Sequence, residues 1–180
     1  MITLGNRIEV FQNDIDPSYL INLIEKINLT SHEFKVVSRR PHLTMEIPIL
    51  FNKEDSLESA EIKSIYMSLA FPSIIDYMKK YNLSGTSSIR HLITVSKLES
   101  NNPQPAHVDN KVGVNSFLAM LYINDDYQDG DIYFPDNNIS YKPKPGDLVI
   151  YPGEVKHGVK ASIGNPRYTI GYGLANIDSE

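Results

Sequence analysis

Two residues in the stretch PAHVDN (105–110) have side chains that could hold a metal ion. In an extended chain, residues i and i+2 point to the same side with Cα atoms about 6.5 Å apart. The His107 imidazole and the Asp109 carboxylate can therefore both reach one small cation at about 2.0–2.2 Å. The H-x-D pair alone is weak, because a chain with 5 histidines and 22 acidic residues forms such a pair easily by chance. A metal site needs at least a third protein ligand.

His157 is the candidate third ligand, at the start of a short β-like run after a Pro-Gly turn. Two histidines and one carboxylate form the 2-His-1-carboxylate triad typical of non-haem Fe(II) oxygenases, which leaves coordination positions open. Zn²⁺ or Ni²⁺ could compete for the same ligands, because affinity order alone does not select Fe(II). The pattern predicts a catalytic metal site formed by His107, Asp109 and His157.

Arg167 follows His157 by ten residues, in the apolar and aromatic run RYTIGYG. An arginine directed inward from such a strand needs an anionic partner, because an unpaired buried charge is costly. A guanidinium can bind a carboxylate through two parallel hydrogen bonds. An iron site beside such an arginine suggests a keto-acid that chelates the metal at one end and is anchored at the other. The alternative is a surface arginine at a strand start.

The N-terminal half contains the expected helices. Residues 7–13 (RIEVFQN) alternate apolar and polar and predict a strand. Asp16 and Pro17 suit the cap and first turn of a helix, whose apolar stripe would be Leu20, Leu23, Ile24 and Ile27. One or two helices are expected over about 55–81, with Pro72 marking a kink or break. Residues 30–52 show no clear period.

The C-terminal half consists of short β-branched or aromatic runs divided by Gly, Pro, Asn and Asp. These runs are IRHLITVSKL, SFLAMLYIND, DIYFPD, ISYKPKPG, DLVIYPG, HGVKASI and RYTIGYGLA. Such a series predicts a barrel or a two-sheet jelly roll. We find no internal repeat and no linker. The expected fold is α+β, mostly β, in a single domain over 1–180, with helical support over about 1–85 and a β core over about 86–176.

The composition is that of an ordinary globular domain, with 41% hydrophobic and 22% charged residues. The chain contains no cysteine, which excludes disulfides, thiolate metal sites and cysteine nucleophiles. A net charge of −5 argues against a broad nucleic-acid-binding face. The N-terminal stretch lacks the features of a secretory signal, and no window reaches the length of a membrane span. A cytoplasmic location is therefore expected.

The motifs over about residues 90–175 resemble the prolyl 4-hydroxylase-like branch of the 2-oxoglutarate/Fe(II)-dependent dioxygenases. The resemblance is carried by HVDN, the Tyr-hydrophobe-Asn of SFLAMLYIND, DGDIYFPD, YKPKPGDLVIYPG and HGVKASIGNPRYTIGY. It implies a double-stranded β-helix (jelly-roll) core with an N-terminal strand and supporting helices. It also implies an enzyme that hydroxylates a C–H bond with Fe(II), 2-oxoglutarate as cosubstrate and O₂, with ascorbate as a candidate reductant.

The resemblance also implies roles for individual residues. The three candidate ligands would hold Fe(II), and Arg167 would bind the distal carboxylate of 2-oxoglutarate. Tyr122 stands where the family places a tyrosine whose hydroxyl joins that arginine, although an ordinary core aromatic is the alternative. Thr169 shares a strand face with Arg167 by the period of two, so it is a candidate for the same pocket. Having Asp109, rather than Gly or Ala, argues against a halogenase.

Two positions depart from the family pattern. Many relatives carry a tyrosine nine or ten residues before the H-x-D histidine, where this chain has Leu98 and Lys97. Relatives also often carry a tryptophan six residues after the basic residue, where this chain has Gly173, on the same strand face as Gly171. Two inward glycines predict a pocket that is wider or differently shaped than in the peptidyl-proline enzymes.

The substrate is the least determined part of the interpretation. Analogy favours a prolyl residue in a peptide or protein, or free proline or another amino acid, but a fold transfers chemistry better than substrate. Residues 101–106 and 38–42 are candidate entrance loops or simply solvated turns. Nucleic-acid demethylases of the superfamily carry a second arginine that this chain lacks after Arg167. The alternative function is a jelly-roll metal-binding module that is non-catalytic or independent of 2-oxoglutarate.

Overall fold

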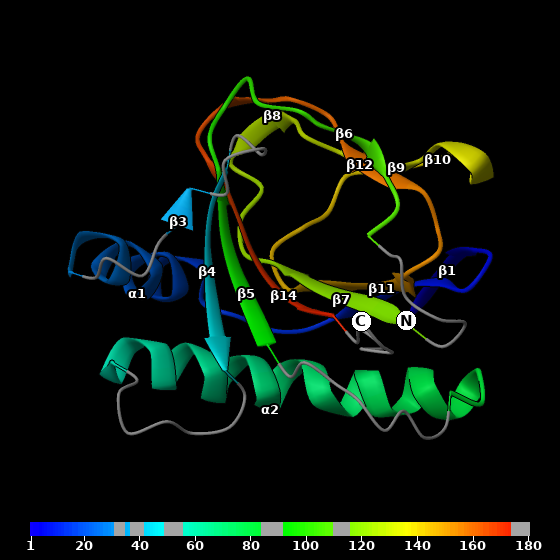
Figure 1. Ribbon diagram of the computed structural model, residues 1–180, viewed down its shortest axis with the longest axis horizontal. Helices are drawn as coiled ribbons and strands as arrows, with labels where there is room; N and C mark the ends of the chain where they lie inside the picture. The colour runs from blue at the N-terminus through cyan, green and yellow to red at the C-terminus, as the bar shows by residue number, and fades with distance from the viewer. Residues whose placement is uncertain (31–34, 37–41, 49–55, 84–91, 110–115, 174–180) are drawn as a thin grey trace, which may run out of the picture.

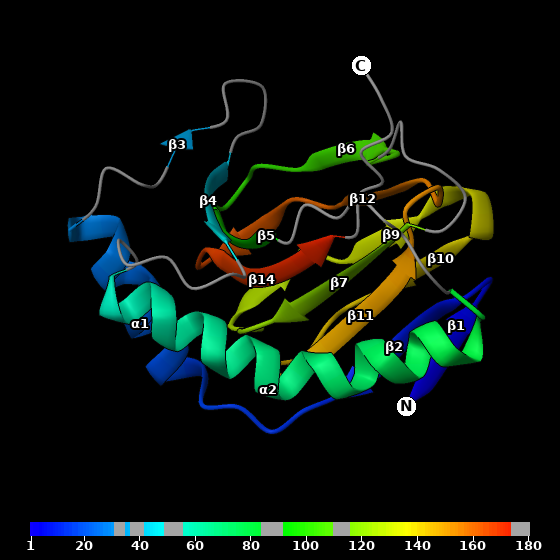
Figure 2. The ribbon, with the colours of Figure 1, turned by 60° about the horizontal axis from the view of Figure 1, so that its bottom comes forward.

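The protein is seen in a computed structural model that describes residues 1–30, 35–36, 42–48, 56–83, 92–109 and 116–173. A large and a small antiparallel sheet stand opposite each other, and two helices lie along the outer face of the large sheet (Figures 1 and 2). The mostly β, jelly-roll fold class predicted from the sequence is confirmed. No helix in these ranges has the length and apolar character needed to cross a membrane.

The sheets are built from strands that are distant in the chain. The large sheet has the order β1-β2-β11-β7-β14-β5-β4-β3. Its strands are Ile2–Gly5, Ile8–Gln12, Asp147–Pro152, Phe117–Tyr122, Arg167–Gly173, Leu92–Leu98, His42–Pro48 and Lys35–Val36. The small sheet has the order β10-β9-β12-β6, with strands Ile139–Tyr141, Ile132–Phe134, His157–Val159 and Gln104–His107. Strands β8 (Tyr127–Asp129) and β13 (Ser162–Gly164) pair separately, and a short 3-10 turn, η1, covers Pro135–Asn137.

Helix α1 (Pro17–Thr30) forms as its sequence predicts. The Asp16 carboxylate accepts a hydrogen bond from the Tyr19 N–H at 3.0 Å, so it caps the first turn. The predicted apolar stripe is buried against the large sheet, with Leu20, Leu23, Ile24 and Ile27 at most 4% exposed. The helix therefore anchors one end of the sheet, as expected from its pattern.

Helix α2 is one helix, Leu57–Lys80, which begins after the cap residue Ser56 and continues through Pro72. Of the two predicted alternatives, a single helix is therefore the one that forms, and a break at Pro72 is wrong. A proline costs a helix one hydrogen bond, but packing supplies most of the stability of a helix in a folded protein. Tyr66, Ala70 and Ile74, on both sides of Pro72, are buried in the core beneath the large sheet.

Strand alternation separates the core from the cavity. On β5, Ile93 and Val95 point into the core between the sheet and the helices, whereas Thr94, Ser96 and Leu98 line the inside of the jelly roll. A second, smaller core lies between the two sheets, around Tyr122, Phe134, Val149 and Tyr151. The large sheet thus has a dry outer face and an inner face available to a ligand.

Strands also form in the part of the chain expected to provide helical support, over about residues 1–85, and the strand predicted over 7–13 corresponds to β2. Strands β1 to β4 lie in this part of the chain and extend the large sheet at both edges. The clearest case is β4, in the segment without a clear period. It pairs with β5 from His42↔Leu98 to Pro48↔Leu92. Whether this segment forms a strand depends on this non-local pairing rather than on its own sequence pattern.

Gly146 of the KPGD motif occupies a position where a side chain does not fit. Its φ is +87°, and an added Cβ would lie 2.0 Å from the Asn13 carbonyl oxygen. Its N–H donates to the Tyr122 carbonyl at 2.9 Å, which joins the start of β11 to the end of β7. We expect Gly146→Ala to lower the free energy of unfolding by about 2–4 kcal/mol through strain and overpacking.

Urea denaturation of this variant checks the prediction, with Gly173→Ala as the matched control. No atom of the described residues lies within 4 Å of a Cβ placed at Gly173. The control should change the free energy of unfolding by less than about 1 kcal/mol. Equal losses in the two variants would show that the close approach at Gly146 is not what matters.

Candidate metal centre and cosubstrate pocket

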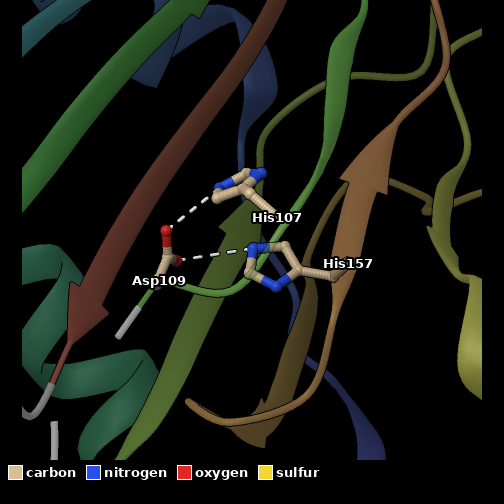
Figure 3. A group of neighbouring side chains, drawn as sticks. All are labelled: His107, Asp109 and His157. Carbon is tan, nitrogen blue, oxygen red and sulfur yellow. Dashed lines mark ion pairs between the residues drawn. The ribbon is translucent and has the colours of Figure 1, made fainter. Parts of the chain in front are cut away.

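The three candidate ligands converge at one point (Figure 3). His107 ends β6 and His157 begins β12, and the two are direct register partners in the small sheet. Asp109 follows β6 by two residues. Its Oδ1 lies 3.0 Å from His107 Nε2 and its Oδ2 lies 3.4 Å from His157 Nε2. The pairing of β6 with β12 thus brings together residues that are 50 positions apart in the sequence.

Both imidazoles are oriented by backbone carbonyls. His107 Nδ1 lies 2.8 Å from the Pro105 oxygen, and His157 Nδ1 lies 3.0 Å from the Val155 oxygen. A carbonyl only accepts, so each Nδ1 carries the hydrogen and each Nε2 faces the shared space. Outer partners of this kind fix the tautomer of histidine ligands in metal sites. The sequence did not identify these two carbonyls.

The spacing of the ligand atoms fits a small divalent cation. Neighbouring ligands about 2.1 Å from an octahedral ion lie about 3 Å apart. The two nitrogen–oxygen distances, 3.0 and 3.4 Å, are close to that separation, and the ligand atoms all lie within 4.8 Å of one another. Two neutral imidazoles and one carboxylate are also a donor set that Fe(II) accepts.

The charge state of the site suits a metal as well. Burial alone would raise the pKa of the Asp109 carboxyl, but its interactions with the adjacent His107 and His157 side chains outweigh this effect and hold that pKa well below its usual range. The Asp109 side chain is 23% exposed and that of His157 is 5% exposed. The Tyr151 ring packs on His157 with centroids 4.7 Å apart. One ligand is therefore packed in the interior, and the carboxylate stays ionised at the opening.

Two of the three candidate ligands border a cavity of about 320 Å³ inside the jelly roll. Asp109 and His157 line it together with Arg167, Tyr122 and Thr169, the three residues expected at the cosubstrate. Arg167 and Thr169 come from β14, and Tyr122 is the last residue of the neighbouring strand β7. The structure thus gathers the candidate site residues around one space.

Arg167 is a buried cation whose hydrogen-bond donors are not all satisfied. The residue is 6% exposed, and within the described part of the chain its Nε and Nη1 have no hydrogen-bond partner. Its Cζ lies 5.6 Å from the centre of the Tyr122 ring. Burial raises the pKa of the Tyr122 hydroxyl, although the Arg167 charge works against this, so the hydroxyl stays protonated and can donate. Unsatisfied buried donors beside a cavity call for an anionic ligand.

The same architecture occurs in solved structures. A prolyl hydroxylase from Trichoplax adhaerens, in complex with a hypoxia inducible factor peptide fragment, superposes with a TM-score of 0.69 and 15% identity, covering 95% of this chain and 84% of that one. A viral collagen prolyl hydroxylase from Paramecium bursaria Chlorella virus-1, in complex with 2-oxoglutarate, superposes with a TM-score of 0.66 and 12% identity. This superposition covers 96% of this chain and 98% of that one. The chain has the fold of the prolyl hydroxylases.

Sequence comparison adds a short match. A protein of Acanthamoeba polyphaga mimivirus named "Putative prolyl 4-hydroxylase" is 44% identical over 41 residues. The match spans 22% of this chain and 17% of that protein. No family model matches the chain. The likeness to prolyl hydroxylases therefore lies mainly in the fold.

Within this prolyl hydroxylase fold, the strand before the H-x-D motif presents Leu98 to the cavity. Lys97 is on the opposite face of β5, where its Nζ pairs with Glu25 at 2.9 Å and with Glu99 at 3.4 Å. The register places Leu98 beside Arg167. The cavity wall next to Arg167 is therefore apolar, and the Lys97 side chain lies on the outer face of the sheet.

The two glycines of β14 both line the cavity, but they differ in what lies over them. A Cβ at Gly171 would come within 2.3 Å of the Met120 sulfur, so the methionine fills that space. Beside Gly173 the space is open as far as the described residues extend. The extra room predicted from the sequence is confined to the Gly173 end. Met120 was missed because only the register of β7 against β14 places it there.

Of the two candidate entrance segments, only 101–106 lies fully within the described residues. Gln104, within 101–106, lines the cavity, and the Pro105 carbonyl orients the candidate ligand His107. Of the segment 38–42, residues 38–41 lie outside the described residues. The segment 101–106 therefore contributes at least one side chain and one backbone atom to the site, and both come from strand β6 rather than from a loop.

Metal binding should raise the thermal stability of the protein. A ligand at a hundred times its Kd stabilises the folded state by about 2.7 kcal/mol, which corresponds to a Tm increase of about 5–10 °C for a chain of this size. Thermal unfolding with and without Mn(II), an air-stable substitute for Fe(II), checks this. The His107→Ala variant should show almost no shift. An equal shift in the variant would mean that the ion binds elsewhere.

Proposed function

We propose that this protein is an Fe(II)- and 2-oxoglutarate-dependent dioxygenase that hydroxylates a C–H bond, in the manner of prolyl 4-hydroxylases. One observation carries the proposal. Asp109 and His157 of the three-residue cluster border the same cavity as a buried Arg167 with unsatisfied donors. A metal site explains the cluster, and an anionic cosubstrate explains the arginine. A keto-acid with a second carboxylate accounts for both.

Each residue has a defined part in this proposal. His107, Asp109 and His157 would hold Fe(II) through two imidazole nitrogens and one carboxylate at the edge of the cavity. Bound Fe(II), with 2-oxoglutarate and O₂, supplies the oxidation of a C–H bond, with succinate and CO₂ as co-products. Arg167 binds the distal carboxylate through its guanidinium, and the Tyr122 hydroxyl donates to the same group. Thr169, 3% exposed on the same strand face, closes that end of the pocket.

The substrate proposed is a prolyl residue in a peptide or protein, or a free amino acid. The likeness to a hydroxylase solved with a peptide fragment supports the peptide reading, and the open space beside Gly173 gives such a substrate room. The use of O₂, a dependence on ascorbate and a cytoplasmic location stay predictions from the sequence. The acidic balance continues to argue against nucleic acid as a partner.

An anaerobic titration tests the function. Metal-free protein receives Fe(II) and then 2-oxoglutarate, and the weak visible absorption of the chelated keto-acid is recorded. A saturable band, followed by succinate release when air and candidate peptides are added, is the expected result. Iron binding without the band would favour a metal protein independent of 2-oxoglutarate. No iron binding at all would favour a jelly-roll module without turnover.

A further inference from the structure

Asn124 completes the Tyr-hydrophobe-Asn motif and has no part in the function proposed above. It lies two residues beyond the end of β7 and is 4% exposed. Its side-chain oxygen accepts from the Tyr168 N–H at 2.9 Å, and its Nδ2 donates to the Pro166 carbonyl at 2.8 Å. These two partners flank Arg167 in the chain. Asn124 thus holds the backbone on both sides of the arginine.

The Asn124 side chain continues the hydrogen bonding between β7 and β14 beyond the point where the β7 backbone pairing ends. The last register pair between β7 and β14 is Tyr122↔Thr169. The Ile123 N–H still donates to the Tyr168 carbonyl at 3.1 Å, but beyond it the chain leaves the strand. The Asn124 amide then supplies both an acceptor and a donor to residues 168 and 166. A buried amide that satisfies two backbone groups makes a rigid local structure.

A third contact ties the amide itself in place. Asn124 Nδ2 lies 2.6 Å from Asp126 Oδ1, and the other carboxylate oxygen accepts from Asn165 Nδ2 at 2.8 Å. Asp126 therefore links Asn124 to the residue that precedes Pro166. The result is a polar clasp, formed by Asn124, Asp126 and Asn165, around the start of β14.

We propose that Asn124 is a positioning residue for Arg167 that sets the affinity for the distal carboxylate of the cosubstrate. This inference rests on the proposed function. A guanidinium that binds a carboxylate through two hydrogen bonds needs a defined position. Within the described part of the chain, Arg167 Nε and Nη1 make no hydrogen bond that would fix this position. Its position therefore depends on the backbone that carries it, which the clasp holds.

The test compares two keto-acids by calorimetry on Mn(II)-loaded protein. One is 2-oxoglutarate, and the other is 2-oxopentanoate, which has the same chain length without the distal carboxylate. Asn124→Ala should weaken 2-oxoglutarate binding about tenfold or more. Binding of 2-oxopentanoate and of Mn(II) should change less than about twofold. A general folding defect would weaken all three, so the ratio between the keto-acids isolates the positioning effect.

Two further variants keep the test decisive if Asn124→Ala does not fold. Asn124→Asp has the same shape and keeps the acceptor for Tyr168, but it cannot donate to Pro166 and it repels Asp126. It should show the same selective loss. In an Arg167→Ala background, Asn124→Asp should cause no further loss of 2-oxoglutarate affinity, because the group it positions is gone.

The outcomes separate this inference from the function it rests on. If the wild-type protein binds 2-oxoglutarate, equal losses of affinity for both keto-acids in the Asn124 variants would overturn the role of Asn124 alone. The absence of a loss for either keto-acid would do so too. An additive loss in the Arg167→Ala background would do the same. Failure of the wild-type protein to prefer 2-oxoglutarate over 2-oxopentanoate would overturn the proposed cosubstrate and this inference together.

Discussion

Asp109→Ala is expected to lower the affinity for Fe(II) by more than about a hundredfold and to abolish succinate release. Loss of an outer partner of a metal ligand already costs about 10–100-fold, and this substitution removes a ligand itself. It also removes the only negative charge in the three-residue cluster, so two imidazoles would face the cation alone. Anaerobic Fe(II) titration followed by a succinate assay measures both effects.

Asp136→Ala is the matched control for this substitution. Asp136 is an exposed carboxylate in η1 and is not a member of the three-residue cluster. Its loss should leave both Fe(II) affinity and turnover within about twofold of wild type, since exposed charges interact weakly. Wild-type Fe(II) affinity in the Asp109 variant would mean that the convergence of the three side chains is structural and not a metal centre.

Arg167→Ala is expected to weaken 2-oxoglutarate binding by about 10²–10⁴-fold while metal affinity is retained. Truncating one partner of a buried charge pair costs about 3–5 kcal/mol, and each 1.4 kcal/mol is a factor of ten. Arg167→Lys keeps the charge but loses the paired donors, so we expect a smaller loss of about tenfold. Calorimetry on the Mn(II)-loaded variants gives both values.

The thermal stability of the ligand-free Arg167 variant provides a second, independent readout. An arginine in a structural ion pair would lower the Tm when removed. Here the guanidinium has donors without partners among the described residues, so its removal relieves a buried charge, and the Tm should stay level or rise. Lys160→Ala, which breaks a half-exposed pair with Asp131, is the control for loss of a cation. A lower Tm in the Arg167 variant with unchanged 2-oxoglutarate affinity would assign Arg167 to the fold.

Much of the site could be predicted from sequence because its determinants are local. The period of two of an extended chain predicts that His107 and Asp109 share a side, although Asp109 lies just beyond β6. The same period puts Arg167, Thr169 and Gly171 on one face of β14. Helix α1 follows from its cap and apolar stripe in the same way. The resemblance to a known family added the role of Tyr122 and identified the suggested keto-acid as 2-oxoglutarate.

The tertiary structure decided the parts that depend on register. Whether Lys97 or Leu98 faces the cavity is set by the pairing of β5 with β14, and a shift of one residue would exchange them. Met120 over Gly171, the direct pairing of His107 with His157 and the hold of Asn124 on β14 are likewise contacts between distant segments. Local patterns specify which face a residue shares with its neighbours. Only non-local strand pairing determines which face lies inside and which residues meet there.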